Sequence, residues 1–395
     1  MDRLKEVVIV DAVRTAIGSF NGSLKDVSAP KLGSIVIQAL LKRTGIEPGI
    51  IDEVIMGNVL PANEGQAPAR QAALGAGLPN SVQCMTINKV CGSGLKSVML
   101  AAQAIMTGDA DVIIAGGMEN MSQVPYYLDG ARFGMKMGNK TVIDGMVKDG
   151  LWDVYNDYHM GNAAELCAKE CKISREEQDN YAEMSYKRAQ QAIKEGTFKD
   201  EIASVTIPQR KGDAIVFETD EEPLKVNFDK LRKLRPAFEK EGSVTAANAS
   251  SINDGAAAVL VMTKEKAQEL NILPMVKIIT QASAAKEPEY FTTAPADAVN
   301  KALHKAGLSI DDIDLFEINE AFSVVSIINN RLLGLSSEKV NVNGGAVALG
   351  HPIGASGARI LTTLLHEMKR KEINRGLASL CIGGGEASTL IVERV

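Results

Sequence analysis

The segments GIEPGIIDEVIMGNVL (45–60) and GLSIDDIDLFEINEAF (307–322) decide the fold, because they are two copies of one pattern. Each copy follows a helix-like stretch, ALLKRTG in the first case and ALHKAG in the second. A further pair of segments, CGSGLK (91–96) and GASGAR (354–359), lies at nearly the same offset along the chain. A constant offset between separated segments predicts that the protein is a duplicated unit.

The segments that follow continue the repeat and indicate the secondary structure of each copy. Apolar residues recur at helical spacing after Gly94 and again after Gly357, which predicts a mostly buried helix behind a Gly-Ser-Gly turn in each half. The next segments, DVIIAGG (111–117) and LASLCIGGG (377–385), are short, apolar and bounded by glycine, as strands buried on both faces are. The alternation of helices and strands predicts an α/β layered fold.

The repeat also locates an insertion in the first half. In the second half, the strand ending near Ile382 is followed directly by another, ASTLIVERV, whereas the matching first-half strand, AAAVLVM (256–262), comes only after a long interval. The insertion carries a helix-capping sequence, Ser174 to Glu177, and a basic stretch, KLRKLRP (230–236). We therefore expect an N-terminal half of residues 1–119 plus 250–273, an inserted domain of residues 120–249, and a C-terminal half of residues 274–395.

The composition excludes several classes of protein. With 45% hydrophobic and 23% charged residues among 395, the chain has the make-up of a globular protein and not of a disordered or fibrous one. A net charge of −6 argues against a broad nucleic-acid-binding surface. No apolar run reaches the roughly 18 residues that span a bilayer, and the charged start MDRLKEVVIV does not fit a signal peptide, so we expect no membrane and a cytoplasmic location. Five cysteines, an odd number, predict thiols and not a disulfide framework.

Cys91 is the first candidate for chemistry. It stands directly before a Gly-Ser-Gly turn and the start of a long predicted helix. A thiol at that position meets the positive end of the helix dipole and free backbone N–H groups, and both favour the thiolate. The alternative is an inert core cysteine, which is the commoner role of a single cysteine.

The second candidate, His351, lies in a loop rich in glycine, NGGAVALGHPIGASG. A phosphate-binding loop does not fit, because no Lys-Ser or Lys-Thr pair follows Gly354, and a dinucleotide-binding turn lacks its third glycine and its preceding strand. A turn histidine hydrogen-bonded to backbone remains the structural alternative.

Cys381 and Asn319 complete the set that the repeat brings together. Cys381 lies near the carboxyl end of a predicted strand, where α/β folds place their sites, and Asn319 follows the strand of the second copy in NEAF. Pseudo-symmetry places equivalent strand and helix ends at the centre of the molecule, so we expect Cys91, Asn319, His351 and Cys381 in one pocket.

The remaining histidines and cysteines give weaker signals. Cys167 and Cys171, with His159, make at most half of a metal site, and no further cluster supplies the missing ligands. His304 and His366 lie in amphipathic segments and are expected to be surface or hydrogen-bonded residues. We therefore predict no metal.

At this point the motifs resemble those of thiolases, and among them the short-chain, biosynthetic type. The likeness rests on NKVCGSG around Cys91, NEAF at Asn319, NGGAVALGHPIGASG around His351 and CIGGG at Cys381, and it covers nearly the whole chain. It implies a thiolase-like fold, with duplicated α/β halves, a five-layered α-β-α-β-α core and an inserted loop domain. It also implies a reversible Claisen condensation of two acetyl-CoA to acetoacetyl-CoA and CoA.

The resemblance assigns roles that suit the residue types. It implies that Cys91 attacks a thioester and becomes acylated, that His351 activates it, and that Cys381 moves a proton at the α-carbon of the second substrate. It assigns the binding of developing oxyanions to His351 with a water held by Asn319, and to the backbone N–H groups of Cys91 and Gly383.

The same resemblance places coenzyme A on the inserted domain. His159, Met160, Ser250 and Phe322 are expected along the pantetheine path, and Lys225 is expected to bind coenzyme A. Two positions depart from the family pattern: Leu224-Lys225 stand where relatives often have an arginine, and Glu386 stands where glutamine is common. The first departure leaves the cation nearest the nucleotide open, and the second leaves the contacts beyond Gly385 open.

Three other functions stay open at this stage. The first is a degradative 3-ketoacyl-CoA thiolase of broader chain length, the second a noncatalytic acyl-CoA carrier of the same fold, and the third a metal-dependent enzyme. We expect no cofactor, since coenzyme A thioesters are substrates. The partners expected are acetyl-CoA, acetoacetyl-CoA and CoA, without nucleic acid, in a homotetramer built as a dimer of dimers.

Overall fold

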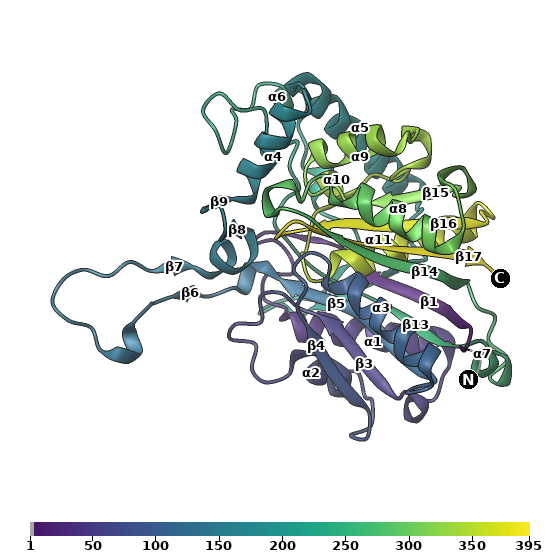
Figure 1. Ribbon diagram of the computed structural model, residues 1–395. Coiled ribbons are helices and arrows are strands. Elements are labelled where there is room, and N and C mark those ends of the chain that lie inside the picture. The colour runs from purple at the N-terminus through teal and green to yellow at the C-terminus, as the bar shows by residue number, and fades with distance from the viewer. Residues whose placement is uncertain (1–3) are drawn as a thin grey trace.

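The computed structural model describes residues 4–395 and consists of two similar halves with one insertion (Figure 1). The main strands of the first half are β1 (Val7–Thr15), β3 (Glu53–Gly57), β4 (Gln83–Ile87), β5 (Val112–Asn120) and β13 (Asn253–Thr263). Those of the second half are β14 (Val276–Ala285), β15 (Leu315–Ile318), β16 (Arg375–Ile382) and β17 (Glu386–Arg394). They follow the order β15-β16-β17-β14-β1-β13-β5-β3-β4.

Strand pairing repeats between the halves and confirms the predicted duplication. In the first half, β3 runs parallel to β5, β5 is antiparallel to β13, and β13 is antiparallel to β1. In the second half, β15, β16, β17 and β14 are paired in the same way. The two half-sheets meet between β1 and β14, where Val8 pairs with Lys277 and Ile9 pairs with Val276.

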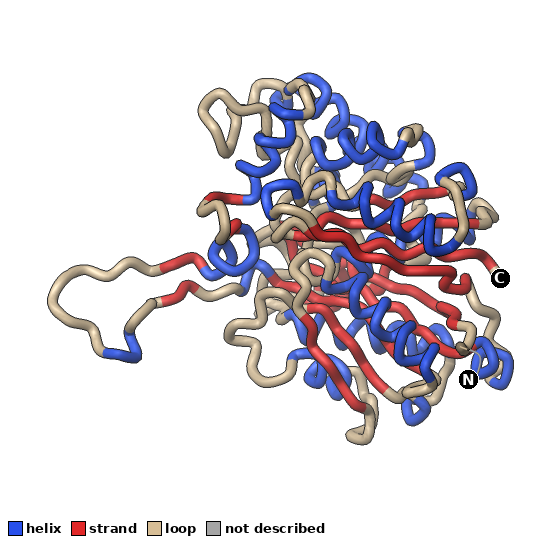
Figure 2. Tube along the Cα trace, in the orientation of Figure 1, coloured by secondary structure: helices blue, strands red, loops and turns tan. Residues whose placement is uncertain are grey.

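Helices lie in three layers around the two half-sheets, which gives the expected five-layered α-β-α-β-α core (Figure 2). The outer helices of the first half are α1 (Ala29–Thr44) and α2 (Pro68–Gly75), and those of the second are α8 (Ala294–Ala306) and α9 (Ser323–Leu333). The central layer consists of α3 (Ser93–Thr107) and α11 (Ser356–Arg370), whose buried apolar residues pack with both half-sheets. The short helices α7 (Lys264–Glu269) and α10 (Ala346–Leu349) lie in the connections.

The Gly-Ser-Gly turns explain how the two central helices meet. A Cβ atom at Gly94 would lie 2.8 Å from the backbone nitrogen of Ala358, and one at Gly357 would lie 2.3 Å from that of Leu95. Real Cβ atoms do not approach other atoms so closely, so only glycine lets the helices begin in contact. This contact places the loop before α3 beside the loop before α11.

The insertion between β5 and β13 carries α4 (Met160–Glu170), α5 (Arg175–Glu195) and α6 (Phe228–Leu231). Its short strands are β6 (Tyr126–Tyr127), β7 (Ile143–Asp144), β8 (Trp152–Asp153), β9 (Tyr158–His159), β10 (Ile202–Ala203), β11 (Val205–Ile207) and β12 (Ile215–Phe217). The predicted capping box at Ser174 and Glu177 is confirmed at the start of α5. Strand β10 pairs with β1, which joins the insertion to the first half. Strand β2 (Gly18–Ser19) pairs with β13 within the first half.

A buried ion-pair cluster strengthens this junction. Arg14 of β1 donates to Glu201 at 2.6 Å and to Asp220 at 2.7 and 2.9 Å, and all three side chains are buried. Breaking one partner would leave an uncompensated buried charge, which is strongly destabilising. The position of the insertion is therefore tied to β1.

One segment is long and apolar enough, by length and composition only, to cross a membrane. The segment Val90–Thr107 has a mean hydropathy of 1.2 over 18 residues, which meets the length and composition of a membrane span. It contains α3, and 56% of it is buried inside the protein. Its apolar character follows from its place in the central layer between two half-sheets.

Candidate active site

One cavity of about 300 Å³ gathers most of the predicted site residues. Its wall includes Cys91, His159, Met160, Ser250, Phe322, His351, Cys381 and Gly383. Asn319 lies beside it, with its side-chain nitrogen 3.4 Å from Nε2 of His351. Lys225 is the one predicted site residue that the structure does not bring to this cavity or its wall.

The loop that carries Cys91 is held in an unusual backbone conformation. Val90 has φ of 47°, in the left-handed region that a β-branched residue rarely adopts. Its N–H donates to Oδ1 of Asn88 at 2.9 Å, and its carbonyl accepts from Oγ of Ser93 at 2.7 Å. These bonds over-determine the strained turn and fix Cys91 just before α3.

The environment of Cys91 differs from the sequence-based expectation in one respect. Burial raises the pKa of the Cys91 thiol to about 11, although the backbone N–H groups of Gly383 and of Cys91 itself act in the opposite direction. Desolvation therefore outweighs the helix N-terminus, and the resting group is a thiol. Cys91 needs a base beside it to become a nucleophile.

His351 is oriented by two hydrogen bonds. Its backbone N–H donates to Oδ1 of Asn253 at 2.9 Å, and its Nδ1 lies 2.5 Å from Oγ of Ser356. The Ser356 hydroxyl donates its single proton to the carbonyl of Pro352 at 2.9 Å, so it accepts from Nδ1 of His351. The proton of the neutral ring therefore sits on Nδ1, and Nε2 carries the lone pair, 3.4 Å from the side-chain nitrogen of Asn319.

The charge state of His351 suits a base. Burial, with Arg359 as a second cause, lowers the pKa of His351 to about 3. The ring is consequently neutral at physiological pH, and Nε2 is available to accept a proton. The sequence indicated His351 but gave no sign of Ser356 or Asn253 as its supports.

Cys381 ends β16 and is almost fully buried, with 1% of its surface exposed. Burial raises the pKa of Cys381 well above its usual value, and the neighbouring Cys91 raises it further. The second cause indicates that the two thiols are close enough to discourage a double negative charge. Both are free thiols.

Asn319 provides an unused acceptor at the same place. Its backbone N–H donates to the carbonyl of Ser379 at 2.9 Å, which fixes the residue next to β16. Its side-chain Oδ1 is buried and has no hydrogen-bond partner within residues 4–395. A buried unsatisfied oxygen beside a neutral imidazole is a suitable place for a bound water.

The insertion supplies the outer wall of the cavity. His159 precedes α4, and its Nδ1 accepts from the N–H of Gly161 at 3.1 Å. Burial lowers the pKa of His159. Phe238 stacks on His159 with ring centroids 4.8 Å apart, and its ring is nearly perpendicular to that of Phe322, with centroids 6.2 Å apart. The sequence gave no sign of Phe238, because its role depends only on the folding of the insertion.

The Lys225 prediction is not supported by its position. The ammonium group donates to Oγ of Ser19 and lies 3.9 Å from the carboxylate of Glu221. These partners belong to the junction between the insertion and the first half. In the basic stretch, Arg232 is engaged by Asn180 and Glu183 at 2.7 and 2.8 Å.

The other candidates from the sequence lie apart from the cavity. The Sγ atoms of Cys167 and Cys171 are 4.0 Å apart, and no group of three or more His, Cys, Asp or Glu in residues 4–395 is arranged to hold a metal ion. Nε2 of His366 lies 2.8 Å from the carbonyl of Ala12, and His304 is exposed.

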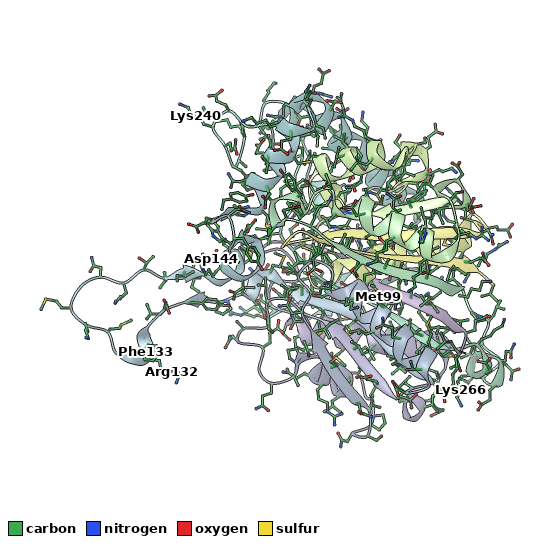
Figure 3. The ribbon with its side chains drawn as sticks, in the orientation of Figure 1. Met99, Arg132, Phe133, Asp144, Lys240 and Lys266 are labelled. Atoms are coloured by element: carbon green, nitrogen blue, oxygen red, sulfur yellow. The ribbon has the colours of Figure 1, made fainter. Side chains whose placement is uncertain are left out.

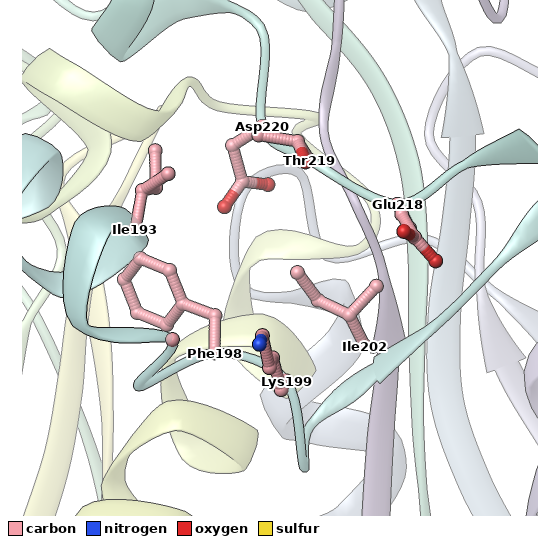
Figure 4. Close-up of a pocket in the computed structure, with 8 residues that line it drawn as sticks. Ile193, Phe198, Lys199, Ile202, Glu218, Thr219 and Asp220 are labelled. Carbon is pink, nitrogen blue, oxygen red and sulfur yellow. The ribbon is translucent and has the colours of Figure 1, made fainter.

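A second cavity of about 350 Å³ lies at the junction between the insertion and the first half (Figure 4). Phe198, Lys199 and Asp220 line it, and none of the predicted site residues does. Both carboxyl oxygens of Asp220 are already bound by Arg14. This cavity is therefore separate from the chemistry at Cys91.

Comparison with known proteins adds independent evidence. The thiolase N-terminal domain matches residues 7–265, and the thiolase C-terminal domain matches residues 272–394. An acetyl-CoA acetyltransferase of Pseudomonas aeruginosa is 54% identical over 392 residues, which cover 99% of this chain and 100% of the relative. Acetyl-CoA acetyltransferase 2 of Arabidopsis thaliana is 54% identical over 98% of this chain and 97% of its own length. The crystal structure of the Bacillus anthracis acetyl-CoA acetyltransferase superposes with a TM-score of 0.97 at 42% identity, covering 100% of both chains.

Proposed function

This chain belongs to the thiolase family, and we propose that it is an acetyl-CoA C-acetyltransferase. It condenses two acetyl-CoA to acetoacetyl-CoA and CoA, reversibly, through an acetyl group carried on Cys91. The observation that carries the proposal is the meeting of two thiols and a neutral histidine of fixed tautomer in one cavity. A noncatalytic carrier needs neither the second thiol nor the oriented base.

The first half-reaction uses Cys91 and His351. Nε2 of His351 takes the proton of Cys91, and the thiolate attacks the carbonyl carbon of acetyl-CoA. The backbone N–H groups of Cys91 and Gly383 face the sulfur and stabilise the oxyanion that forms. The bond from carbon to the CoA sulfur then breaks, and the thiol of Cys381 gives its proton to the departing CoA.

The second half-reaction uses the thiolate left on Cys381. It removes a proton from the methyl group of the second acetyl-CoA, whose carbonyl oxygen is held by His351 and by a water on Asn319. The carbanion attacks the acetyl group on Cys91 and forms the carbon–carbon bond. The Cys91 sulfur leaves and recovers its proton from His351, which restores the resting state.

The electrostatics of the two thiols supports this order. Cys91 raises the pKa of Cys381, so ionising both thiols together is unfavourable. Once Cys91 carries an acetyl group it can no longer bear charge. The buried Cys381 thiolate then has a high proton affinity, as removal of a proton from a weakly acidic methyl group requires.

The walls around the thiols favour a short acyl group. Apolar side chains of Met121, Leu151 and Ile353 line the cavity together with the thiols, within a total of about 300 Å³. Longer acyl chains would have to displace these side chains, which cluster with Val59, Leu60 and Met146. A degradative enzyme of broad chain length is the second candidate, and the ratio of kcat/KM for acetoacetyl-CoA to that for longer 3-ketoacyl-CoA substrates separates the two.

A projecting arm supports assembly into a homotetramer, a dimer of dimers. Residues 124–145 carry β6 and β7 and extend away from the body of the protein, with Arg132 and Phe133 at a short helical turn on the lower limb of the arm (Figure 3). Tyr126, Phe133 and Met137 are exposed by 66%, 91% and 104%. Exposed apolar side chains in such number mark an interaction site, and its occupant is a second copy of the chain. Phe133→Asp with Met137→Asp should lower the oligomer mass seen by light scattering, whereas an unchanged tetramer would contradict the assignment.

The activity is proposed to need no cofactor and no metal, and to take place in the cytoplasm. The direct test mixes the purified protein with acetyl-CoA and measures acetoacetyl-CoA and free CoA by mass spectrometry. Cys91→Ser should abolish both products, and Cys84→Ser, which changes a thiol on β4 away from the cavity, should leave them unchanged. Activity in Cys91→Ser would contradict the proposal. So would an activity that is lost on prolonged dialysis against chelator and returns only in the sample supplemented with metal.

A further inference from the structure

Two loops must keep their relative position for the chemistry proposed above. One carries Cys91, and the other is the turn Gly383–Gly385, which supplies the N–H of Gly383. Gly384 and Gly385 have φ of 89° and 85°, and a Cβ at Gly384 would meet no atom within 4 Å. The turn closes the hairpin of β16 and β17, where Ile382 pairs with Glu386, and the carbonyl of Gly385 accepts from the N–H of Lys286 at 2.9 Å. These bonds hold the turn to its own sheet and do not reach the loop that carries Cys91.

Few contacts join the loop that carries Cys91 to the turn Gly383–Gly385. A Cβ at Gly92 would lie 2.3 Å from Cδ1 of Ile382, and one at Gly383 would lie 3.5 Å from Cγ1 of Val90. These contacts prevent closer approach but do not stop the loops from separating. The one salt bridge within residues 4–395 that joins the two segments links Nζ of Lys89 to Oε2 of Glu386.

The ion pair of Lys89 and Glu386 lies next to both loops in the sequence. Lys89 stands two residues before Cys91, and its N–H donates to Oγ of Ser93 at 2.8 Å. Glu386 follows the glycine turn directly and begins β17. The side chains are 24% and 37% exposed, so the pair is only partly screened by water.

A third charge lies beside the pair. Burial lowers the pKa of Lys96 on α3, Lys89 lowers it further, and Glu386 acts in the opposite direction. Glu386 therefore faces two cations, Lys89 and Lys96. Without it, Lys89 and Lys96 would repel each other, whereas without Lys89 the carboxylate would still face Lys96.

We propose that Glu386, through its ion pair with Lys89, is a positioning residue that holds the Gly383 N–H against Cys91. Glu386 does not line the cavity that contains Cys91, so it acts through the backbone of the turn. The inference rests on the proposed function, because the N–H of Gly383 matters only if an oxyanion forms there.

The test is a double-mutant cycle in the full-length enzyme. Glu386→Gln should lower kcat and the single-turnover rate of Cys91 acetylation by about three- to tenfold, with KM for acetyl-CoA changed less than twofold. Lys89→Gln should have a smaller effect, because Lys96 remains to face Glu386. The double variant should be no worse than Glu386→Gln, since both changes break one interaction.

Glu393→Gln is the matched control. It removes a carboxylate from the same strand, where Glu393 pairs with Lys277 and Arg375 at 2.6 Å, at the end away from the glycine turn. It should leave kcat unchanged even if it lowers the melting temperature. If both single variants at the pair stay within twofold of wild type, or if their effects multiply in the double variant, the inference is wrong. A wild type that neither acetylates Cys91 nor condenses acetyl-CoA would overturn the proposed function and this inference with it.

Discussion

Replacing Ser356 by alanine tests how the tautomer of His351 is set. In the structure, Nδ1–H of His351 donates to Oγ of Ser356, whose own proton goes to the carbonyl of Pro352. Alanine removes the acceptor, and Nδ1–H would then be buried without a partner. The ring can escape that cost by moving its proton to Nε2, the atom that must accept the proton of Cys91.

The size of the effect follows from these contacts. Losing the correct form of a general base lowers kcat by at least about 10²-fold, and a base held in the wrong tautomer lowers it by up to about 10⁴-fold. The carbonyl of Pro352 keeps the backbone N–H groups of Ala355 and Ser356 as donors, so stability should fall only by about 0.5–1.5 kcal/mol, the net value of a lost hydrogen bond. KM for acetyl-CoA should change little, because Ser356 is not on the cavity wall.

The assay is the burst of CoA released when Cys91 is acetylated, together with steady-state kcat and KM. Thr362→Val is the matched control on the same helix. Thr362 is also fully buried and also donates its hydroxyl to the carbonyl four residues earlier, that of Ala358 at 2.9 Å, but it does not touch His351. It should cost stability without slowing the burst.

Two results would refute this reasoning. The first is a Ser356→Ala enzyme whose burst rate stays within twofold of wild type. The second is a Thr362→Val enzyme slowed as much as Ser356→Ala, which would show that a loosened helix, and not the tautomer, is responsible.

Three further outcomes follow from the site and its surroundings. Cys381→Ser should still accept acetyl on Cys91 but lose at least about 10²-fold in condensation; unchanged condensation would remove its assigned role. Burial raises the pKa of Asp254 to about 6, so its carboxyl favours folding at acid pH and opposes it once ionised. Unfolding titrations should therefore show wild type losing about 3 kcal/mol relative to Asp254→Asn as pH rises from 3.8 through 6, and a constant difference would contradict the assigned cause. Lys225→Ala should leave KM for acetyl-CoA within about twofold, because Lys225 is held by Ser19 and Glu221, and a large rise in KM would restore its predicted contact.

The duplicated fold could be predicted because its determinants are local and repeated. The Gly-Ser-Gly turns and the apolar periodicity after Gly94 and Gly357 specify two helices that begin in contact. The same pattern occurs in both copies. The insertion could not be predicted in the same detail. Its strands are only two or three residues long and have no periodicity to read, and the pairing of β10 with β1 joins residues far apart in sequence.

The site was predictable where residue type and strand end coincide. Cys91, His351 and Cys381 each stand beside glycines at the start or end of a repeated element, so the repeat alone brings them together. Phe238 and Asn253 lie in segments whose local sequence indicates nothing about the partners that they meet.

The ionisation state of Cys91 could not be predicted from the local sequence alone. The helix start after Cys91 argued for a thiolate, and this argument is correct as far as the backbone N–H groups are concerned. Burial is a property of the whole fold, and it dominates in the direction of the thiol. The same distinction applies to Lys225, whose neighbours Ser19 and Glu221 only the folded chain identifies.

The central claim is that Cys91 carries the acyl group while Cys381 moves the proton. The most direct measurement is to incubate the wild-type protein with labelled acetyl-CoA, quench it in acid, and locate the label by peptide mapping. The account predicts one acetyl group on the peptide that contains Cys91 and none on the peptide that contains Cys381. Label on Cys381, or none on either peptide, would contradict it.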